Sequence, residues 1–171
     1  LRPVSMQVIR YARKMGLDMI QGDHEDAPGQ LELNWMFDDV LRNADRLTTY
    51  RQICAQVARE HGIFACFMTK PFMGVSASGC HHNMSLWRGG EDQFVKCGND
   101  PDNLPGMRDN YMYVKGGSNT FMPDDDDPQM PGAEGLVAIG GVVHHLQALT
   151  AIGCSTVNSY RRLWDTGFWA P

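Results

Sequence analysis

The feature that most constrains this chain is a long stretch of helical periodicity from about Asp38 to His61. Its apolar residues recur at intervals of three and four, which predicts a helix with one apolar face: Val40, Leu41, Ala44, Leu47, Cys54, Val57 and Ala58. Asp38 or Asp39 is placed to cap the start of this helix, and Gly62 is placed to end it.

Two further helices and several short strands are predicted around it. Residues 4–15 have amphipathic spacing and precede Gly16, and a last helix is expected from Ala133 to Ile152. Strands are expected where apolar runs are short or alternate with polar residues: from Met19, over Gln30–Trp35, Ile63–Met68 and His81–Trp87. Residues 88–131 are rich in turn residues and read as loop, including the run Asp124–Asp127. This order predicts an α+β fold with a curved sheet.

The composition excludes several classes of partner. A net charge of −5 disfavours nucleic acid or an anionic membrane as the main partner, but it leaves room for a phosphate ligand. The five cysteines form no CxxC pair, which favours reduced thiols in a cytoplasmic protein. Neither a membrane-spanning run nor a signal peptide is expected. Because the chain starts without Met and stops at Pro171, we interpret it as an internal fragment of a longer protein.

The first segment that carries chemistry runs from Gly22 to Glu32. Glu25 and Glu32 flank a Pro28-Gly29 turn, and Glu32 alternates with apolar neighbours. If those neighbours pack on helices, Glu32 points to the other face of the sheet, where a carboxylate needs a partner such as a metal ion. A surface hairpin with solvated acids remains the alternative.

The second segment joins a Gly/Ser loop, Gly74–Gly79, to His81, His82 and Asn83. In a strand His81 and Asn83 share one face. A histidine in such a place is either a metal ligand or an ordinary hydrogen-bonded side chain. Carboxylates with one imidazole suit Mg²⁺ or Mn²⁺ better than zinc, because close Cys and His companions are absent.

The third segment, Asn158–Leu163, contains the adjacent arginines Arg161 and Arg162. Arginine binds carboxylate and phosphate groups through two parallel hydrogen bonds, so this pair fits a substrate that carries both. The alternative is a helix end whose dipole the arginines complement.

Together and in this order, the three segments resemble the glutamine synthetase family. The resemblance extends over essentially the whole chain, with a divergent loop near 105–130. Its motifs match three stretches of this sequence: His24-Glu25 with Pro28–Glu32, Phe67–Trp87, and Asn158–Leu163. The resemblance implies one catalytic domain, of which residues 1–171 are a part, with antiparallel strands curved into a partial barrel and helices outside. It also implies a large ring-shaped homo-oligomer with active sites between subunits.

The resemblance further implies a role for each matched residue. Glu25, Glu32 and His81 correspond to the family's ligands for two Mg²⁺ or Mn²⁺ ions. Asn83 and Ser85 correspond to contacts with ATP, and Ala77 and Gly79 lie in the loop over the glutamate site. Arg162 corresponds to the catalytic arginine that binds the carboxylate of the substrate glutamate. The implied reaction is the ATP-dependent joining of glutamate to ammonia or a small amine through γ-glutamyl phosphate.

Departures from the family pattern leave the acceptor open. Ser76-Ala77 replaces the Asn-Gly of the glutamate loop, and Trp169 replaces the glutamate that takes a proton from ammonium. This combination resembles the branch that makes γ-glutamyl amides of alkylamines, such as γ-glutamylmethylamide. Two alternatives remain: a non-ligase relative that uses the metal site for hydrolysis, and a scaffold protein, against which the retained ligands argue.

Overall fold

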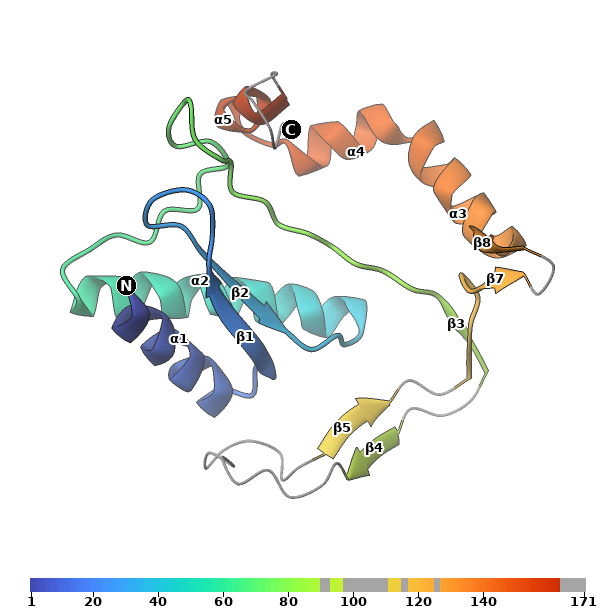
Figure 1. The fold of residues 1–171 in the computed structure, drawn as a ribbon, viewed down its shortest axis with the longest axis horizontal. Coiled ribbons are helices and arrows are strands. Elements are labelled where there is room, and N and C mark those ends of the chain that lie inside the picture. The colour runs from blue at the N-terminus through green and yellow to red at the C-terminus, as the bar shows by residue number, and fades with distance from the viewer. Residues whose placement is uncertain (90–92, 97–110, 115–116, 125–126, 164–171) are drawn as a thin grey trace.

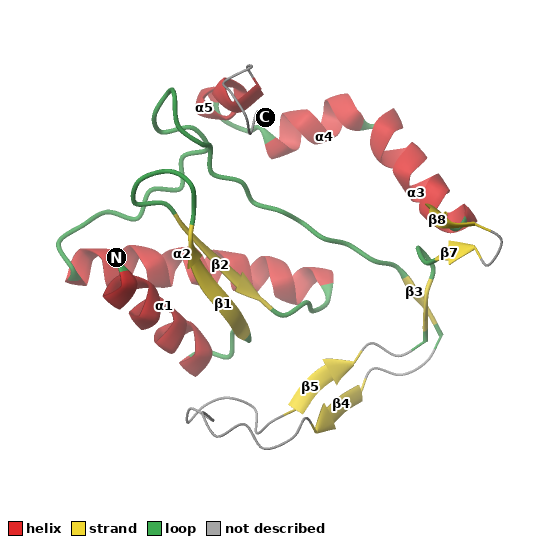
Figure 2. Cartoon of the chain, in the orientation of Figure 1, coloured by secondary structure: helices red, strands yellow, loops and turns green. Residues whose placement is uncertain are grey.

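The computed structural model describes residues 1–89, 93–96, 111–114, 117–124 and 127–163 (Figure 1). Helices and strands are mixed along the chain, which confirms the α+β class (Figure 2). The elements, in order, are α1 (Arg2–Lys14), β1 (Met19–His24), β2 (Leu31–Trp35), α2 (Val40–Glu60), β3 (Trp87–Arg88), β4 (Gln93–Lys96), β5 (Tyr111–Val114), β6 (Ser118–Asn119), β7 (Pro123–Asp124), β8 (Asp127–Pro131), α3 (Ala133–His144), α4 (Leu146–Gly153), α5 (Val157–Tyr160) and the 3-10 helix η1 (Arg161–Leu163).

The hydrophobic core lies where α1 and α2 pack against the β1–β2 hairpin, as Figure 1 shows in blue and cyan. It consists of buried residues from both helices, from β1 and from the α1–β1 turn: Val8, Ile9, Ala12, Leu17, Met19, Ile53, Cys54 and Val57. Leu33 and Trp35 of β2 pack against this cluster, whereas Glu32 between them is exposed. The alternation therefore places the two faces of β2 as the sequence predicts.

Helix ends in this region follow the expected capping chemistry. The carboxylate of Asp39 caps α2 by accepting a hydrogen bond from the backbone N–H of Arg42 at 2.9 Å. Gly16 and Gly62 follow α1 and α2 with φ angles of +83° and +69°, which only glycine adopts without strain. Each helix is thus followed by a glycine in the left-handed conformation that is typical of helix C-termini.

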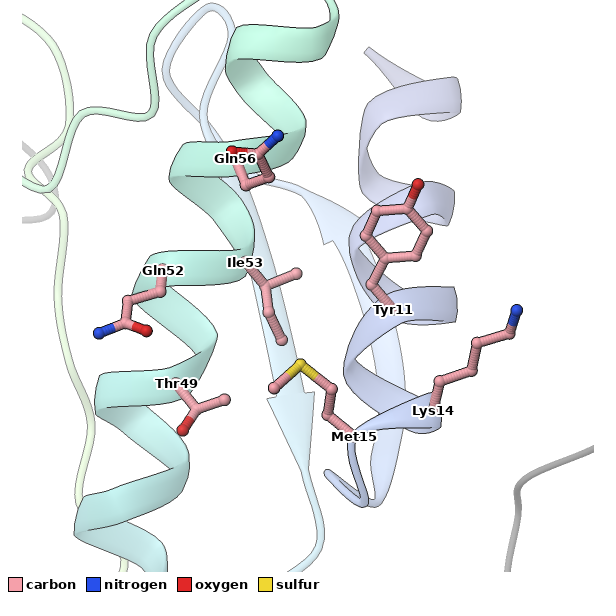
Figure 3. A pocket seen from close by; sticks show the side chains of 7 residues that line it. All are labelled: Tyr11, Lys14, Met15, Thr49, Gln52, Ile53 and Gln56. Atoms are coloured by element: carbon pink, nitrogen blue, oxygen red, sulfur yellow. The ribbon is translucent and has the colours of Figure 1, made fainter.

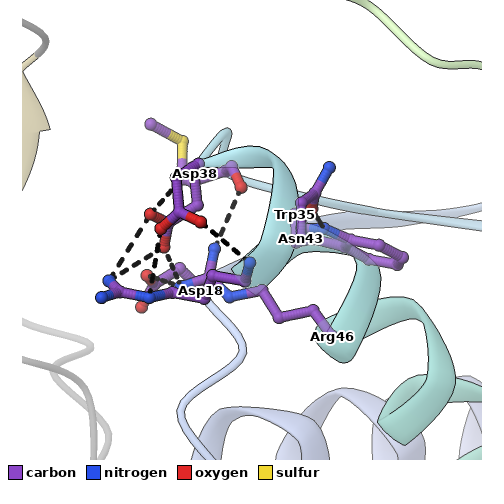
Figure 4. Close-up of polar contacts among 8 residues, drawn as sticks. Asp18, Trp35, Asp38, Asn43 and Arg46 are labelled. Carbon is purple, nitrogen blue, oxygen red and sulfur yellow. Dashed lines mark hydrogen bonds and ion pairs between the residues drawn. The ribbon is translucent and has the colours of Figure 1, made fainter.

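A buried arginine connects the open end of the hairpin to α2 (Figure 4). Arg46 is only 6% exposed, and its Nη2 lies 2.8 Å from Asp38 and 3.1 Å from Asp18. Its Nη1 also donates to the carbonyl of Met36 at 3.4 Å. Because Asp18 precedes β1 and Met36 follows β2, one guanidinium fixes both strand ends relative to the helix.

After Gly62 the described strands pair only two at a time: β3 with β6, β4 with β5 and β7 with β8. The prediction of a strand over Ile63–Met68 was wrong, because this segment is extended but unpaired, and Phe64 is 94% exposed. The predicted strand at His81–Trp87 is reduced to Trp87–Arg88. The larger curved sheet is therefore not formed among the described residues.

The predicted helix from Ala133 to Ile152 is two helices, α3 and α4, bent by 69° at His145. Both carry many exposed apolar side chains. Within the described ranges no single helix has the length and apolar character needed to cross a membrane, although the bent α3–α4 pair meets that requirement by length and composition.

Candidate functional site

The three segments singled out in the sequence meet beside the tip of the β1–β2 hairpin. The side chain of Gln30, at the end of the hairpin turn, donates from Nε2 to the carbonyl of Ala77 at 2.9 Å and to the hydroxyl of Ser78 at 3.2 Å. The hydroxyl of Ser76 donates to the carboxylate of Asp26. Two side chains of the turn therefore contact three successive residues of the Gly74–Gly79 loop.

Asn158 attaches the arginine segment to the strand-like stretch before this loop. Its Oδ1 accepts from the backbone N–H of Lys70 at 2.8 Å and from the hydroxyl of Thr69 at 3.1 Å. Its Nδ2 donates to the carbonyl of Lys70 at 2.8 Å. The side-chain amide thus bonds both the N–H and the carbonyl of the Lys70 backbone, as a neighbouring strand would. Because Asn158 lies in α5, these bonds hold α5, and η1 after it, next to the start of the loop.

The side chain of Lys70 connects the start of the loop to the segment that precedes it. Its side chain is 2% exposed, and Nζ donates to the carbonyl of Val75 at 2.5 Å. The backbone N–H of Ser78 donates to the carbonyl of Thr69 at 2.8 Å. The loop is thus fixed at its start, at its end and along the side that faces the hairpin.

Glu25 and Glu32 come together across the hairpin. The pKa of Glu25 is raised above its usual value, mainly because its side chain shares a hydrogen bond with Glu32. The pKa of Glu32 is lowered, first by a hydrogen bond from the amide of Asn34, 2.8 Å away, then by the bond with Glu25 and by the charge of His81. Two neighbouring carboxylates that influence each other's pKa in this way offer oxygen ligands to a divalent cation, which competes with protons for them.

The donor set suits Mg²⁺ or Mn²⁺, since two carboxylates and an imidazole are ligands that these ions accept. His81 is near enough to Glu32 to influence its pKa. Among the described residues, however, no three His, Cys, Asp or Glu side chains converge into a ready coordination shell. The assignment of Glu25, Glu32 and His81 as metal ligands stays a prediction.

Gly79 has a packing reason to be glycine. A Cβ built on it would lie 3.0 Å from Nε2 of His81, so the imidazole rests against the glycine backbone. This contact places the predicted substrate loop and the predicted metal ligand side by side.

The remaining predicted residues are less enclosed. Asn83 and Ser85 are exposed, and the Ser85 hydroxyl accepts from the indole N–H of Trp87 at 2.8 Å. Nε of Arg162 is buried and has no hydrogen-bond partner within the described parts of the chain. Trp169 lies outside the described residues. The nucleotide and glutamate contacts of these residues stay predictions.

A groove of about 410 Å³ between α1 and α2 is separate from this arrangement (Figure 3). Tyr11, Lys14 and Met15 line it from the α1 side. Thr49, Gln52, Ile53 and Gln56 line it from α2. None of these residues belongs to the three segments, so the groove takes no part in the candidate site.

Sequence reasoning assigned no role to Asp26, Gln30 or Asn158, which hold the segments together. For Gln30 a signal exists: a long amide beside a Pro-Gly turn can bond backbone groups that the turn leaves unpaired. For Asp26 and Asn158 the partners are 50 and 88 residues away, and no local pattern indicates contacts of that range.

Comparison with known proteins gives consistent results. A family model described as glutamine synthetase, catalytic domain, matches residues 1–113 and 101–171. A glutamine synthetase of Rhizobium leguminosarum bv. phaseoli is 35% identical over 163 residues, which are 94% of this chain and 31% of that protein. One from Thermotoga maritima is 35% identical over 158 residues, 92% of this chain and 29% of the relative.

The solved structures that resemble the chain include two of GmaS. The apo form without ligand superposes with a TM-score of 0.68 at 30% identity, covering 94% of this chain and 32% of GmaS. An ADP complex of GmaS gives a TM-score of 0.67 at 30% identity, with 94% and 31% covered.

The chain spans about a third of the length of these relatives. The family model nevertheless accounts for the chain from its first residue to its last. This chain belongs to the glutamine synthetase family and corresponds to part of its catalytic domain.

Proposed function

We propose that the protein is an ATP-dependent carbon–nitrogen ligase that joins glutamate to ammonia or a small amine through γ-glutamyl phosphate. The observation that carries this proposal is the meeting of the three family segments, made by the side chains of Gln30 and Asn158. A protein that kept only the fold would have no need to hold its carboxylates, glycine loop and arginine together.

In this proposal Glu25, Glu32 and His81 hold Mg²⁺ or Mn²⁺. The ions, when bound, neutralise phosphate charge during phosphoryl transfer. The raised pKa of Glu25 means that protons compete with the ion there, whereas the amide of Asn34 helps to keep Glu32 ionised. Asn83 and Ser85 are proposed to contact the nucleotide from the exposed stretch that follows His81.

Glutamate is proposed to lie over the Gly74–Gly79 loop, with the backbone at Ala77 and Gly79 facing it. Arg162 is proposed to bind its carboxylate, and the unpartnered Nε is a donor available for that task. Holding the carboxylate and the loop in one orientation brings the glutamate side chain to the phosphoryl donor, which lowers the entropic cost of the reaction.

The decisive test is ADP formation by the native full-length protein with ATP and Mg²⁺. Dependence on both glutamate and an amine supports the ligase. ADP release that needs neither substrate favours the second candidate, a relative that uses the metal site for hydrolysis.

For the acceptor we propose a small alkylamine such as methylamine as the alternative to ammonia. Trp169 in place of the family glutamate and the Ser76-Ala77 loop support this choice, as does the likeness to GmaS. An apolar wall suits an alkyl substituent, whereas ammonium needs a fixed carboxylate to take its proton. A higher kcat/KM for methylamine than for ammonium supports the alkylamine; strict preference for ammonium refutes it.

The larger context is proposed from the same family membership. Residues 1–171 form part of a single catalytic domain, whose remaining strands complete the curved sheet as a partial barrel. We also propose a ring-shaped homo-oligomer in the cytoplasm, with neither nucleic acid nor membrane as a partner. Light scattering of the native protein measures the ring size.

A further inference from the structure

The hairpin that carries the predicted metal ligands and the loop that carries the predicted glutamate site are different segments, and Gln30 connects them. Gln30 lies two residues before Glu32 and five after Glu25. Its Nε2 donates to Ala77 and Ser78, 47 and 48 residues further along the chain. A change in the position of one segment is therefore transmitted to the other through this amide.

The orientation of the amide is set by a third hydrogen bond. Oε1 of Gln30 accepts from the backbone N–H of Ala27 at 3.1 Å, which closes the turn from inside. Because only the carbonyl oxygen of the amide can accept, the nitrogen must face the loop. Both ends of the side chain are used, and the half-buried position limits alternative rotamers.

The loop itself has few other contacts with the hairpin. Lys70 and Thr69 fix it to its own flanking segment. From the hairpin, only Asp26 and Gln30 reach residues 76–78 through hydrogen bonds given for the described parts of the chain. Of these, Gln30 alone bonds the loop backbone, so it determines where the carbonyl of Ala77 lies relative to the two carboxylates.

We propose that Gln30 is a positioning residue that sets the distance between the glutamate loop and the metal-binding hairpin. The inference rests on the proposed function for its meaning in catalysis, but the link itself is a property of the structure. In this proposal Gln30 acts through Ala77 and Ser78, to which its amide is bonded, and not by binding substrate or metal itself. Its loss is expected to weaken glutamate binding and leave metal binding at the hairpin unchanged.

Two variants separate the roles of the two ends of the amide. Gln30→Met keeps the length and neutrality of the side chain and removes all three hydrogen bonds. Gln30→Glu keeps the acceptor for Ala27 and removes the donor to the loop. With each net hydrogen bond worth a factor of roughly 2 to 10, loss of the two loop bonds is expected to raise KM for glutamate roughly 4- to 100-fold.

The experiment uses the native full-length protein and three measurements: KM for glutamate, Mn²⁺ affinity and hydrogen exchange of the peptide covering residues 74–79. In both variants we expect KM to rise, kcat to change less than KM, and the loop amides to exchange roughly 4- to 100-fold faster. Gln30→Met is expected to keep the wild-type Mn²⁺ affinity. Gln52→Glu, on the exposed side of α2, makes the same chemical change away from the loop and is expected to match wild type.

The outcomes separate the inference from the proposed function. Unchanged exchange of the loop in Gln30→Met overturns the inference, whatever the activity. Faster exchange in Gln30→Met, together with a wild-type protein that forms no glutamate-dependent ADP, supports the link and refutes the ligase. A loss of Mn²⁺ affinity in Gln30→Met equal to the loss of glutamate binding also overturns the inference, because it indicates general disruption of the site.

Discussion

Residues 1–62 and the described part of residues 63–163 differ in the kind of contact that stabilises them. In the first region two helices cover one face of a hairpin, and every buried apolar side chain among the described residues lies here. The second region has two-stranded ribbons and a bent helix pair whose apolar side chains are largely exposed. Near the site the two regions are joined by hydrogen bonds, which involve polar side chains of the first region such as Gln30 and Asp26.

This difference teaches how the site is supported. Apolar burial is non-directional and stabilises the α1–α2–hairpin core as a whole. Hydrogen bonds are directional, so they can place a loop relative to a carboxylate. Aromatic contacts add to the junction, since Phe67 packs edge-on to Tyr50 with ring centroids 6.3 Å apart. The apolar core of the first region keeps the hairpin rigid, and the polar contacts position the Gly74–Gly79 loop relative to it.

The largest effect is expected at the buried arginine of the first region. Arg46→Met keeps much of the side-chain volume but leaves the nearly buried carboxylate of Asp38 without its buried partner, so that only the exposed Arg42 remains. Removing one partner of a buried ion pair costs about 3–5 kcal/mol of unfolding free energy. Urea denaturation measures it. The exposed Arg42, also paired with Asp38, is the matched control, and Arg42→Met is expected to cost under about 1 kcal/mol.

An isoleucine pair tests the contrast in apolar burial directly. Ile53 is 6% exposed in the core, and Ile152 of α4 is 77% exposed. Ile53→Ala is expected to cost about 2–5 kcal/mol, because it leaves a cavity, and Ile152→Ala less than about 0.5 kcal/mol. Thermal unfolding of both variants is the measurement. Equal costs would break the comparison and show that α4 is covered in the native protein.

The junction at Asn158 is expected to be intermediate. Asn158→Ala removes three hydrogen bonds to residues 69 and 70 in a partly buried place. A cost of about 1–3 kcal/mol follows. Faster proteolysis or hydrogen exchange of residues 155–163, with α1 and α2 unaffected, confirms that the amide joins the regions. Uniform loosening of the whole protein contradicts it.

The smallest expected effect is the pH dependence of metal binding at the hairpin. The pKa of Glu25 is raised by its hydrogen bond with Glu32. Protons therefore compete with Mn²⁺ at pH values above those at which an ordinary glutamate is protonated. Affinity is therefore full above the pKa of Glu25 and weakens roughly tenfold per pH unit below it, where one proton must leave for each ion bound. Isothermal titration at several pH values checks this. Glu25→Gln should bind Mn²⁺ more weakly and with less pH dependence.

Local features of this fold were predictable from the sequence. Helix α2 begins and ends within about two residues of its predicted bounds, because the cap at Asp39 and the left-handed Gly62 are local signals. The alternation of Leu31, Glu32 and Leu33 likewise placed the carboxylate opposite the core.

Features that depend on a distant partner were not predictable. Ile63–Met68 has the composition of a buried strand, but no described strand lies beside it, and composition does not identify a partner. The break at His145 follows from no proline or glycine at that position. For the site, the motifs predict roles for Glu25, Glu32, His81 and Arg162, whereas the amides that connect their segments are found only in the three-dimensional structure.

The hydrogen bonds of Gln30 and Asn158 also affect the order in which parts of the protein are expected to fold. They close loops of 47 and 88 residues, whereas the β1–β2 hairpin forms between neighbours in the chain. Because the entropic cost of closure grows with loop length, local contacts form first and distant ones later. On refolding, we therefore expect helical structure to return before the Gly74–Gly79 loop is protected, so that the candidate site forms after the core.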